Sequence, residues 1–191
     1  MLNKLFEILT KVSQSSRIKL LATIYDNRAL EMGRGLIFKS LPELTILGTG
    51  KITLGNGVYI GKNVELRAYE GAELIIEANC KIDNGVRIIA ARSAKVHIKE
   101  GSKIGFYSVI NGGSNVSVGP NSSTYGFVYI QASAHTLSQQ GGFSKSDYIH
   151  DEINIGESVL IGPHSVLNPG ASVESNVVLD AHSVLSKKND E

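Results

Sequence analysis

The chain has 191 residues, with 19 Lys and Arg against 18 Asp and Glu, and 20 Gly against 4 Pro and no Trp. A formal net charge of +1 gives no reason to expect a nucleic-acid partner, and the length suits one domain with a small appendage. A single cysteine, Cys80, excludes an internal disulfide and a cysteine-based zinc site, and it fits a reducing cytoplasm.

Residues 2–24 carry an apolar stripe at helical spacing, which is interrupted at residues 13–16. We predict one or two helices that cap a repeat domain, because the end of a solenoid exposes apolar core and unpaired strand edges. An alternative is a membrane-surface helix whose basic side carries Lys4, Lys11, Arg17 and Lys19. The sequence contains no run of 18 apolar residues, so we predict no membrane-spanning helix. Residues 1–10 lack the apolar region of a signal peptide. We assign residues 1–45 to this cap and its lead-in.

From residue 46 onward, aliphatic residues recur at a spacing of six, in sets of three. The interval at which a new set begins shortens slightly toward the C-terminus. The members are Leu54, Ile60, Leu66; Ile76, Ile82, Ile88; Ile98, Ile104, Ile110; Val118, Thr124, Ile130; and Ile155, Ile161, Leu167, Val173, Leu179, Leu185. Three such six-residue units (hexads) per set predict a three-sided prism, in which each hexad supplies a short strand and a corner. Residues 46–191 are therefore predicted to form an all-β solenoid of parallel strands.

Small interruptions and corners fit the same repeat. The residues added near 69–73, 91–94 and 113–115 predict bulged corners, and Asn-Gly pairs such as Asn84-Gly85 reach positive φ easily. Cys80 occupies the fifth place after Ile76, where small residues recur, so we predict a core residue rather than a nucleophile.

The hexad rhythm stops after Ile130 and resumes at Ile155. The intervening residues are polar and predict a protruding loop at about 132–153, and long loops in compact repeats are usually functional. His135 lies early in this loop and His150 near its return. Three further histidines are predicted to face outward from the solenoid: His97, His164 and His182.

The hexads of residues 46–187 resemble those of the bacterial hexapeptide-repeat transferases, which run aliphatic-Gly-x-x-small-x. The segment IGESVLIGPHSVLNPGASV after the loop is also similar to this family. The resemblance implies a left-handed parallel β-helix and a homotrimer with active sites between subunits. The family includes galactoside and maltose acetyltransferases and the O-acetyltransferases of capsule and O-antigen polysaccharides. The polar SKSD stretch at 144–147 is more similar to the polysaccharide O-acetyltransferases.

The resemblance places the catalytic histidine of this family at His135. Acetyl transfer from a thioester to a hydroxyl needs a general base, and an imidazole suits that role at neutral pH. Backbone N–H groups at a coil corner can stabilise the developing oxyanion. We therefore predict an acetyl-CoA-dependent O-acetyltransferase acting on a sugar, with both substrates bound together and no acyl-enzyme.

The same resemblance implies that acetyl-CoA, as co-substrate, lies along the C-terminal coils. The positions that match the family's contacts are Pro163, Ala181, Ser186 and Lys187. Gly105 stands where many members have an asparagine that orients the acceptor, and Tyr107 or Asn111 are candidates for that role. No metal is expected.

Three other functions stay open at this point. An N-acetyltransferase acting on an amino sugar would use a carboxylate near the amine, and the local candidates are Asp147, Asp151 and Glu152. A hydratase of the γ-carbonic anhydrase type would need three histidine ligands, and the outward histidines lack the close pair expected there. A noncatalytic scaffold would bind no acetyl-CoA.

Overall fold

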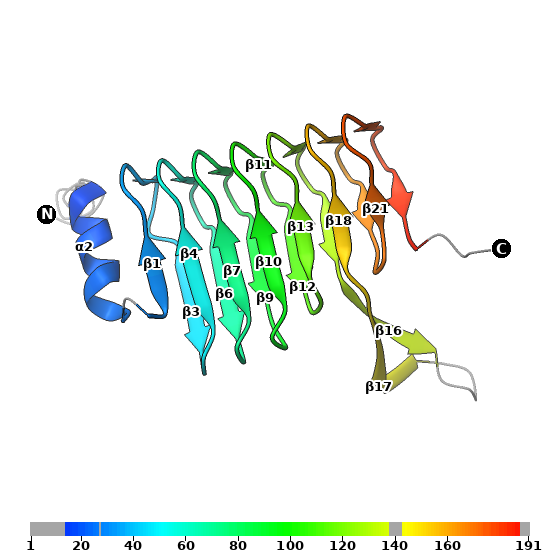
Figure 1. Ribbon diagram of the computed structural model, residues 1–191, viewed down its shortest axis with the longest axis horizontal. Helices are drawn as coiled ribbons and strands as arrows, with labels where there is room; N and C mark the ends of the chain where they lie inside the picture. Colours follow the sequence, from blue (N-terminus) through cyan, green and yellow to red (C-terminus); the bar gives the residue numbers. More distant parts are fainter. Residues whose placement is uncertain (1–13, 27, 138–142, 188–191) are drawn as a thin grey trace, which may run out of the picture.

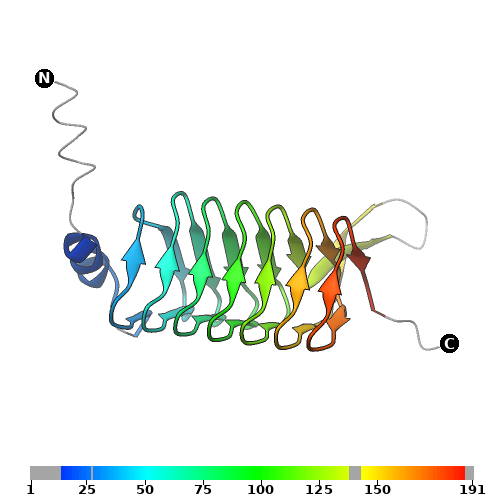
Figure 2. The same ribbon diagram turned by 90° about the horizontal axis from the view of Figure 1, so that it is seen from above.

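The computed structural model describes residues 14–26, 28–137 and 143–187, which form a three-sided prism with a helix at its N-terminal end (Figure 1, Figure 2). The prism has three parallel sheets, here called faces A, B and C, and the coils wind in a left-handed sense, as predicted. Face A contains β1 (Leu30–Met32), β4 (Lys51–Leu54), β7 (Glu73–Ile76), β10 (Lys95–Ile98), β13 (Val116–Val118), β18 (Ile153–Ile155) and β21 (Ser172–Val173). Face B contains β2 (Ile37–Phe38), β5 (Tyr59–Ile60), β8 (Lys81–Ile82), β11 (Lys103–Ile104), β14 (Ser123–Thr124), β19 (Leu160–Ile161) and β22 (Val178–Leu179). Face C contains β3 (Glu43–Leu47), β6 (Glu65–Tyr69), β9 (Arg87–Ala90), β12 (Val109–Gly112), β15 (Tyr129–Gln131), β20 (Val166–Leu167) and β23 (Val184–Leu185).

The strand register confirms the coils predicted from the hexads. Leu54 pairs with Ile76 and Ile76 with Ile98, so each residue that opens a set lies beside the one that opens the next. Ile155 pairs with Val173 in the same way near the C-terminus, where the coils are shortest. The extra residues of the longer coils lie at the corner where the chain passes from face C to face A.

The hexad aliphatics form one continuous core. From Leu54 to Val173 each is at most 5% exposed, and burial of such a side chain contributes about 1.5–3 kcal/mol. The small fifth places also face inward, where Ser102 Oγ donates to Gly119 O at 2.7 Å and Ser165 Oγ donates to Gly162 O at 2.8 Å. Since these hydroxyls bond corner carbonyls, a polar atom is buried without losing its hydrogen bond.

The β-helix begins earlier than the predicted boundary at residue 46. Strands β1, β2 and β3 form a coil within residues 30–47 that pairs in register with the next one. Met32, Phe38 and Leu44 follow one another at the hexad spacing and occupy the hexad positions of this coil. A search for aliphatic residues at the hexad spacing did not detect the first coil, because two of its three hexad positions are methionine and phenylalanine.

Helix α2 (Gln14–Ile24) covers the open end of that first coil, as expected of a cap. Leu21 is 5% exposed and belongs to the same core as Leu30, and Ile18 packs against it. Residues 1–13, including Lys4 and Lys11 of the membrane-surface alternative, lie outside the described residues. No helix in the described part of the chain is long and apolar enough to span a membrane.

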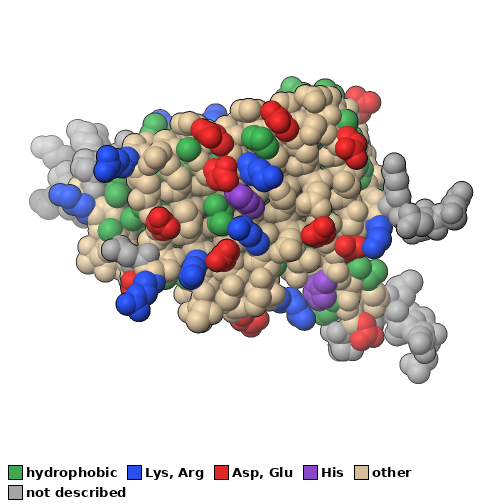
Figure 3. All heavy atoms as spheres, viewed as in Figure 1, with side chains coloured by type: hydrophobic (Ala, Val, Ile, Leu, Met, Phe, Trp, Pro, Cys, Tyr) green, Lys and Arg blue, Asp and Glu red, His purple; other side chains and the backbone are tan. Residues whose placement is uncertain are grey.

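A β-hairpin projects from the corner between faces C and A, where the protruding loop was predicted (Figure 1, Figure 2). Its antiparallel strands are β16 (Ser133–Leu137) and β17 (Phe143–His150). On the face of the prism seen in Figure 3, acidic and basic side chains are interspersed rather than gathered by sign. That distribution agrees with a net charge close to zero.

Candidate active site

The hairpin separates two pockets on the surface of the prism. Residues directly opposite in an antiparallel pair share one side, so Ser133 with His150 and His135 with Tyr148 face one way. Ala134 and Ile149 face the other way. The first side lines a pocket of about 530 Å³, here called the upstream pocket, and the second lines one of about 370 Å³, the downstream pocket. Both pockets include Ala134, so they meet at the base of the hairpin.

His135 presents its imidazole to the upstream pocket. The ring is exposed, and its centroid lies 4.1 Å from that of Tyr148 with the two planes tilted by 37°. Tyr148 in turn stacks on His150 at 5.7 Å, so three rings line the hairpin side of this pocket. The opposite wall comes from the prism, with Ala91, Arg92, Asn111, Gly113, Tyr129 and Gln131. The predicted catalytic histidine therefore lies in a pocket of the size that small ligands occupy.

Gly113 fixes how closely the hairpin approaches the prism. A Cβ added there would lie 2.3 Å from Ser133 Oγ and 2.8 Å from Ser133 Cβ. The same hypothetical atom would lie 3.7 Å from His150 Nδ1. Any side chain at this corner would displace the hairpin, because the first residue of the hairpin packs directly against Gly113.

Polar side chains on face C connect the two pockets. Asn111 Nδ2 donates to Tyr129 Oη at 2.8 Å within the upstream pocket. Gln131 Nε2 donates to Asn168 Oδ1 at 2.9 Å, and Asn168 Nδ2 donates to Ser186 Oγ at 3.2 Å. These last three side chains come from three successive coils, so hydrogen bonds run from the pocket of His135 to the last coil.

The downstream pocket contains two of the residues predicted to contact acetyl-CoA, Ser186 and Lys187. Lys187 Nζ lies 2.9 Å from Asp151 Oδ2, and both side chains are partly exposed. The hydrogen bond and charge of Lys187 hold the pKa of Asp151 below its ordinary value. The pair joins the last coil to the end of the hairpin segment.

The other predicted residues lie at a different corner, between faces B and C. Pro163 and Ala181 form the turns of the last two coils there, and Tyr107 lies at the same corner two coils upstream of Pro163. The described chain brings Asn111 together with His135 and brings Ser186 together with Lys187. It leaves Tyr107, Pro163 and Ala181 on the far side of face C.

Exposed rings form a ladder at this second corner, which the sequence reading missed. Tyr107 stacks on Phe127 at 5.6 Å, Phe127 on His164 at 5.1 Å, and His164 on His182 at 5.2 Å. His164 and His182 face outward as predicted. Beside the ladder, Phe106, Tyr125 and Gly105 line a pocket of about 260 Å³ on face B. The signal was available in the sequence, because the four rings are separated by whole coils.

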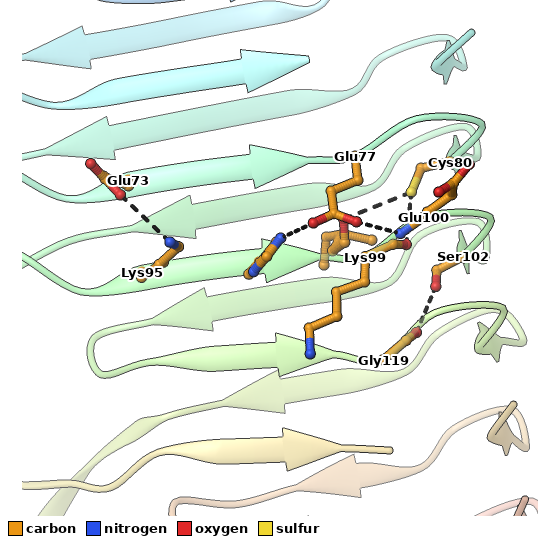
Figure 4. Close-up of polar contacts among 10 residues, drawn as sticks. Glu73, Glu77, Cys80, Lys95, Lys99, Glu100, Ser102 and Gly119 are labelled. Atoms are coloured by element: carbon orange, nitrogen blue, oxygen red, sulfur yellow. Dashed lines mark hydrogen bonds and ion pairs between the residues drawn. The ribbon is translucent and has the colours of Figure 1, made fainter. Parts of the chain in front are cut away.

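Cys80 and His97 have structural contacts, and those of Cys80 are drawn in Figure 4. Cys80 is 1% exposed with its Sγ 3.0 Å from Lys99 O, and burial raises the pKa of the thiol to about 11, as expected of a core cysteine. His97 faces outward, half-buried, and its Nε2 lies 2.6 Å from Oε1 of Glu77. Among the residues the structure describes, no three His, Cys, Asp or Glu side chains are grouped to hold a metal ion.

The fold and the hairpin define a hexapeptide-repeat parallel β-helix protein. No family model and no curated protein matches the chain. Among solved structures it is similar to the polysialic acid O-acetyltransferase OatWY, with 18% identity, a TM-score of 0.61, and 84% of this chain and 81% of that chain covered. It is also similar to AntD, an N-acyltransferase from Bacillus cereus solved with dTDP and 3-hydroxybutyryl-CoA, with 17% identity, a TM-score of 0.52, and 87% and 76% covered. Both likenesses establish the fold.

Proposed function

We propose that this chain is an acetyltransferase that transfers the acetyl group of acetyl-CoA to a hydroxyl of a saccharide, with His135 as the general base. One observation carries the proposal: His135 faces a pocket of about 530 Å³ that meets, at Ala134, a second pocket containing Ser186 and Lys187. Two adjoining pockets with a histidine at their boundary suit a reaction in which both substrates are bound together. The likeness of the fold to an O-acetyltransferase and to a CoA-binding N-acyltransferase supports the same class.

The residues of the downstream pocket fit part of a CoA molecule. Lys187 offers a cation for a phosphate and Ser186 a hydroxyl, while Ala134 and Ile149 supply apolar wall for a pantetheine chain. A volume of about 370 Å³ accommodates only a portion of so long a molecule. We therefore assign the remaining contacts to a neighbouring subunit, in line with the predicted homotrimer.

A trimer would also unite residues that one chain keeps apart. Tyr107, Pro163 and Ala181 lie across face C from the hairpin. Packing of the corner between faces B and C against the hairpin of the next subunit would bring these three residues to its pockets. The exposed rings of Phe106, Tyr125 and Phe127 beside that corner supply apolar surface for such a contact.

The reaction requires one proton relay. His135 accepts the proton of the acceptor hydroxyl as its oxygen attacks the thioester carbonyl carbon, and a tetrahedral intermediate forms. Backbone N–H groups at a coil corner stabilise the oxyanion of this intermediate. When it collapses, the C–S bond breaks and the imidazolium returns the proton to the CoA thiolate. The products are an acetyl ester and CoA, and His135 is restored.

The first test is calorimetric binding of acetyl-CoA, followed by assays of CoA release with the variant His135→Ala. We expect saturable binding near one site per subunit and similar donor affinity in the variant. Transfer should fall by about 10²- to 10⁴-fold, the usual contribution of a general base. Transfer at the wild-type rate in His135→Ala would contradict the assigned base. Absence of acetyl-CoA binding at millimolar ligand would favour a noncatalytic scaffold.

The second candidate is N-acylation of an amino sugar, which the similarity to AntD favours. A panel of matched amino and hydroxy sugars distinguishes the two, since an N-acyltransferase would acetylate only the amine and would favour higher pH. Among the carboxylates proposed to assist it, Asp151 is already paired with Lys187. For the O-acetyltransferase we further propose a cytoplasmic role in the biosynthesis of a surface polysaccharide.

A further inference from the structure

The upstream pocket has an unbalanced positive charge. Arg92 is the one residue with a permanent charge among those that line it, and no Asp or Glu lines it beside Arg92, His135 and His150. The other two pockets described above each contain a carboxylate, Asp83 or Asp151, close to a lysine. The upstream pocket therefore keeps a cation that is not neutralised by its own walls.

Arg92 differs in this respect from the arginines on face C. Arg67 and Arg87 both form ion pairs with Glu65. Within the described part of the chain, Arg92 forms no ion pair or hydrogen bond through its side chain. An arginine kept unpaired at the wall of a pocket is available to an anionic ligand.

The backbone at this corner brings the Arg92 side chain close to the hairpin. Arg92 and Ser93 both have positive φ, 58° and 59°, which costs energy for residues other than glycine. Ser93 Oγ donates to Glu70 O at 3.1 Å and anchors the corner to the preceding coil. In the following coil Gly113 occupies the same corner and adds no side chain between Arg92 and the hairpin.

The rest of the pocket offers groups that bind a saccharide. Asn111 and Gln131 present amides, Tyr129 a phenol, and the exposed ring of Tyr148 a surface for a sugar ring. A guanidinium binds a carboxylate through two parallel hydrogen bonds, which fixes orientation as well as charge. An acidic sugar would thus be held by its carboxylate at one wall, with its hydroxyls turned toward His135 on the other.

We propose that Arg92 makes the upstream pocket specific for an acidic saccharide, whose ring carboxylate it binds while a hydroxyl of the same sugar lies at His135. This inference rests on the proposed function for the identity of the reaction, but it concerns recognition and is measured separately. The phosphates of a nucleotide sugar are the other source of negative charge, and the test below separates the two.

The experiment measures binding by NMR or calorimetry, with CoA present, for oligosaccharides of a uronic acid and of a nonulosonic acid. Their carboxyl-reduced forms and a nucleoside-diphosphate sugar whose sugar ring carries no charge serve as comparison ligands. The variant is Arg92→Gln, and its matched control is Arg34→Gln, which removes an exposed arginine from the first coil. We expect Arg92→Gln to weaken binding of an acidic oligosaccharide by roughly ten- to a hundredfold, the usual effect of one hydrogen-bonded charge. Its affinity for the reduced forms should stay unchanged, and Arg34→Gln should behave as wild type.

Any of the following results would overturn the inference: no acidic oligosaccharide binds, the wild type binds acidic and reduced forms equally, or Arg92→Gln weakens both to the same extent. Binding of the nucleotide sugar in an Arg92-dependent manner, without binding of the acidic oligosaccharides, would assign the arginine to a phosphate instead and would also overturn it. If neutral sugars are acetylated and Arg92→Gln does not affect this, the proposed function holds and the inference about Arg92 fails. If acidic sugars bind in an Arg92-dependent manner but acetyl-CoA does not bind, the inference about Arg92 holds and the proposed function fails.

Discussion

Replacement of Gly113 by alanine tests whether the packing of the hairpin sets the position of His135. The new Cβ would lie 2.3 Å from Ser133 Oγ, about 1.1 Å short of the 3.4 Å at which ordinary contact begins. Rotation of the hydroxyl cannot relieve the clash, because Ser133 Cβ itself lies at 2.8 Å. The first residue of β16 must therefore move by about 0.6 Å or more. Gly113 is absent from the positive-φ residues, so the substitution acts through this contact rather than through backbone strain.

A displacement of this size has different effects on stability and on catalysis. Overpacking at one corner costs about 1–3 kcal/mol, which the long core of the β-helix tolerates. Displacement of a catalytic group by about 1 Å can cost about 10²-fold in rate. We expect Gly113→Ala to lower kcat by about ten- to a hundredfold while acetyl-CoA binding and the folded state persist.

The assay combines kcat and KM with thermal unfolding, and the double variant Gly113→Ala, Ser133→Gly provides the control. The second substitution removes both atoms that the new methyl group meets, so it should restore most of the lost rate. Wild-type kinetics and stability in Gly113→Ala would refute the reasoning. Failure of Ser133→Gly to rescue a slow variant would show that the loss arises elsewhere.

Three further outcomes follow from contacts within the prism. Ile88→Ala should lower the free energy of unfolding by about 2–5 kcal/mol in urea titrations, because Ile88 is 0% exposed in a central coil. A smaller loss would mean that the neighbouring coils collapse into the cavity left by the substitution. Cys80 should resist a thiol reagent at pH 8 in the native protein and react after unfolding, since its pKa is raised to about 11 by burial. Desolvation raises the pKa of Glu77, but the Glu100 N–H and His97 outweigh it and the net pKa is lowered. Above the ordinary carboxylate pKa of 4.5, the wild type should therefore be more stable than Glu77→Gln. This difference in stability should disappear as the pH falls through the lowered pKa of Glu77. A difference that does not change with pH would contradict the interaction of Glu77 with His97 and the Glu100 N–H.

The repeat was predictable because each hexad must bury one residue at a fixed place. From Leu54 to Val173 that residue is aliphatic, with one threonine, and the spacing alone defines strands, corners and coils. The first coil escaped the prediction because Met32 and Phe38 fill the same places with other shapes. The core geometry can thus be predicted from local spacing. The aliphatic repeat fails to reveal a coil only where the buried hexad residue is not aliphatic.

The candidate site was predictable only in part, because it depends on segments far apart in the chain. His135 was singled out by the resemblance to the hexapeptide-repeat transferases, and Asn111 reaches the same pocket through coil stacking. Arg92 and Tyr148 gave no signal, and His150 was noted only near the return of the loop, since nothing local tells which corner of the prism a hairpin lies against or which of its residues share a side. The register of β16 against β17, in which His135 pairs with Tyr148, decides which residues of the hairpin share a side.

All variation in coil length in the described prism is confined to one of its three corners. The core residues of faces A, B and C follow one another at a constant spacing of six, as in Leu54, Ile60 and Leu66 or in Ile155, Ile161 and Leu167. The return from face C to face A is short from Leu167 to Val173, longer from Leu66 to Ile76, and longest from Ile130 to Ile155, where the hairpin is inserted. Two of the three corners of every coil therefore keep a constant length. The third corner accepts inserts, and the hairpin is the longest of them. Under the proposed function, we expect exchange of that insert to change the hairpin wall of the upstream pocket opposite Arg92, and so to alter acceptor preference with no change to a residue of the core.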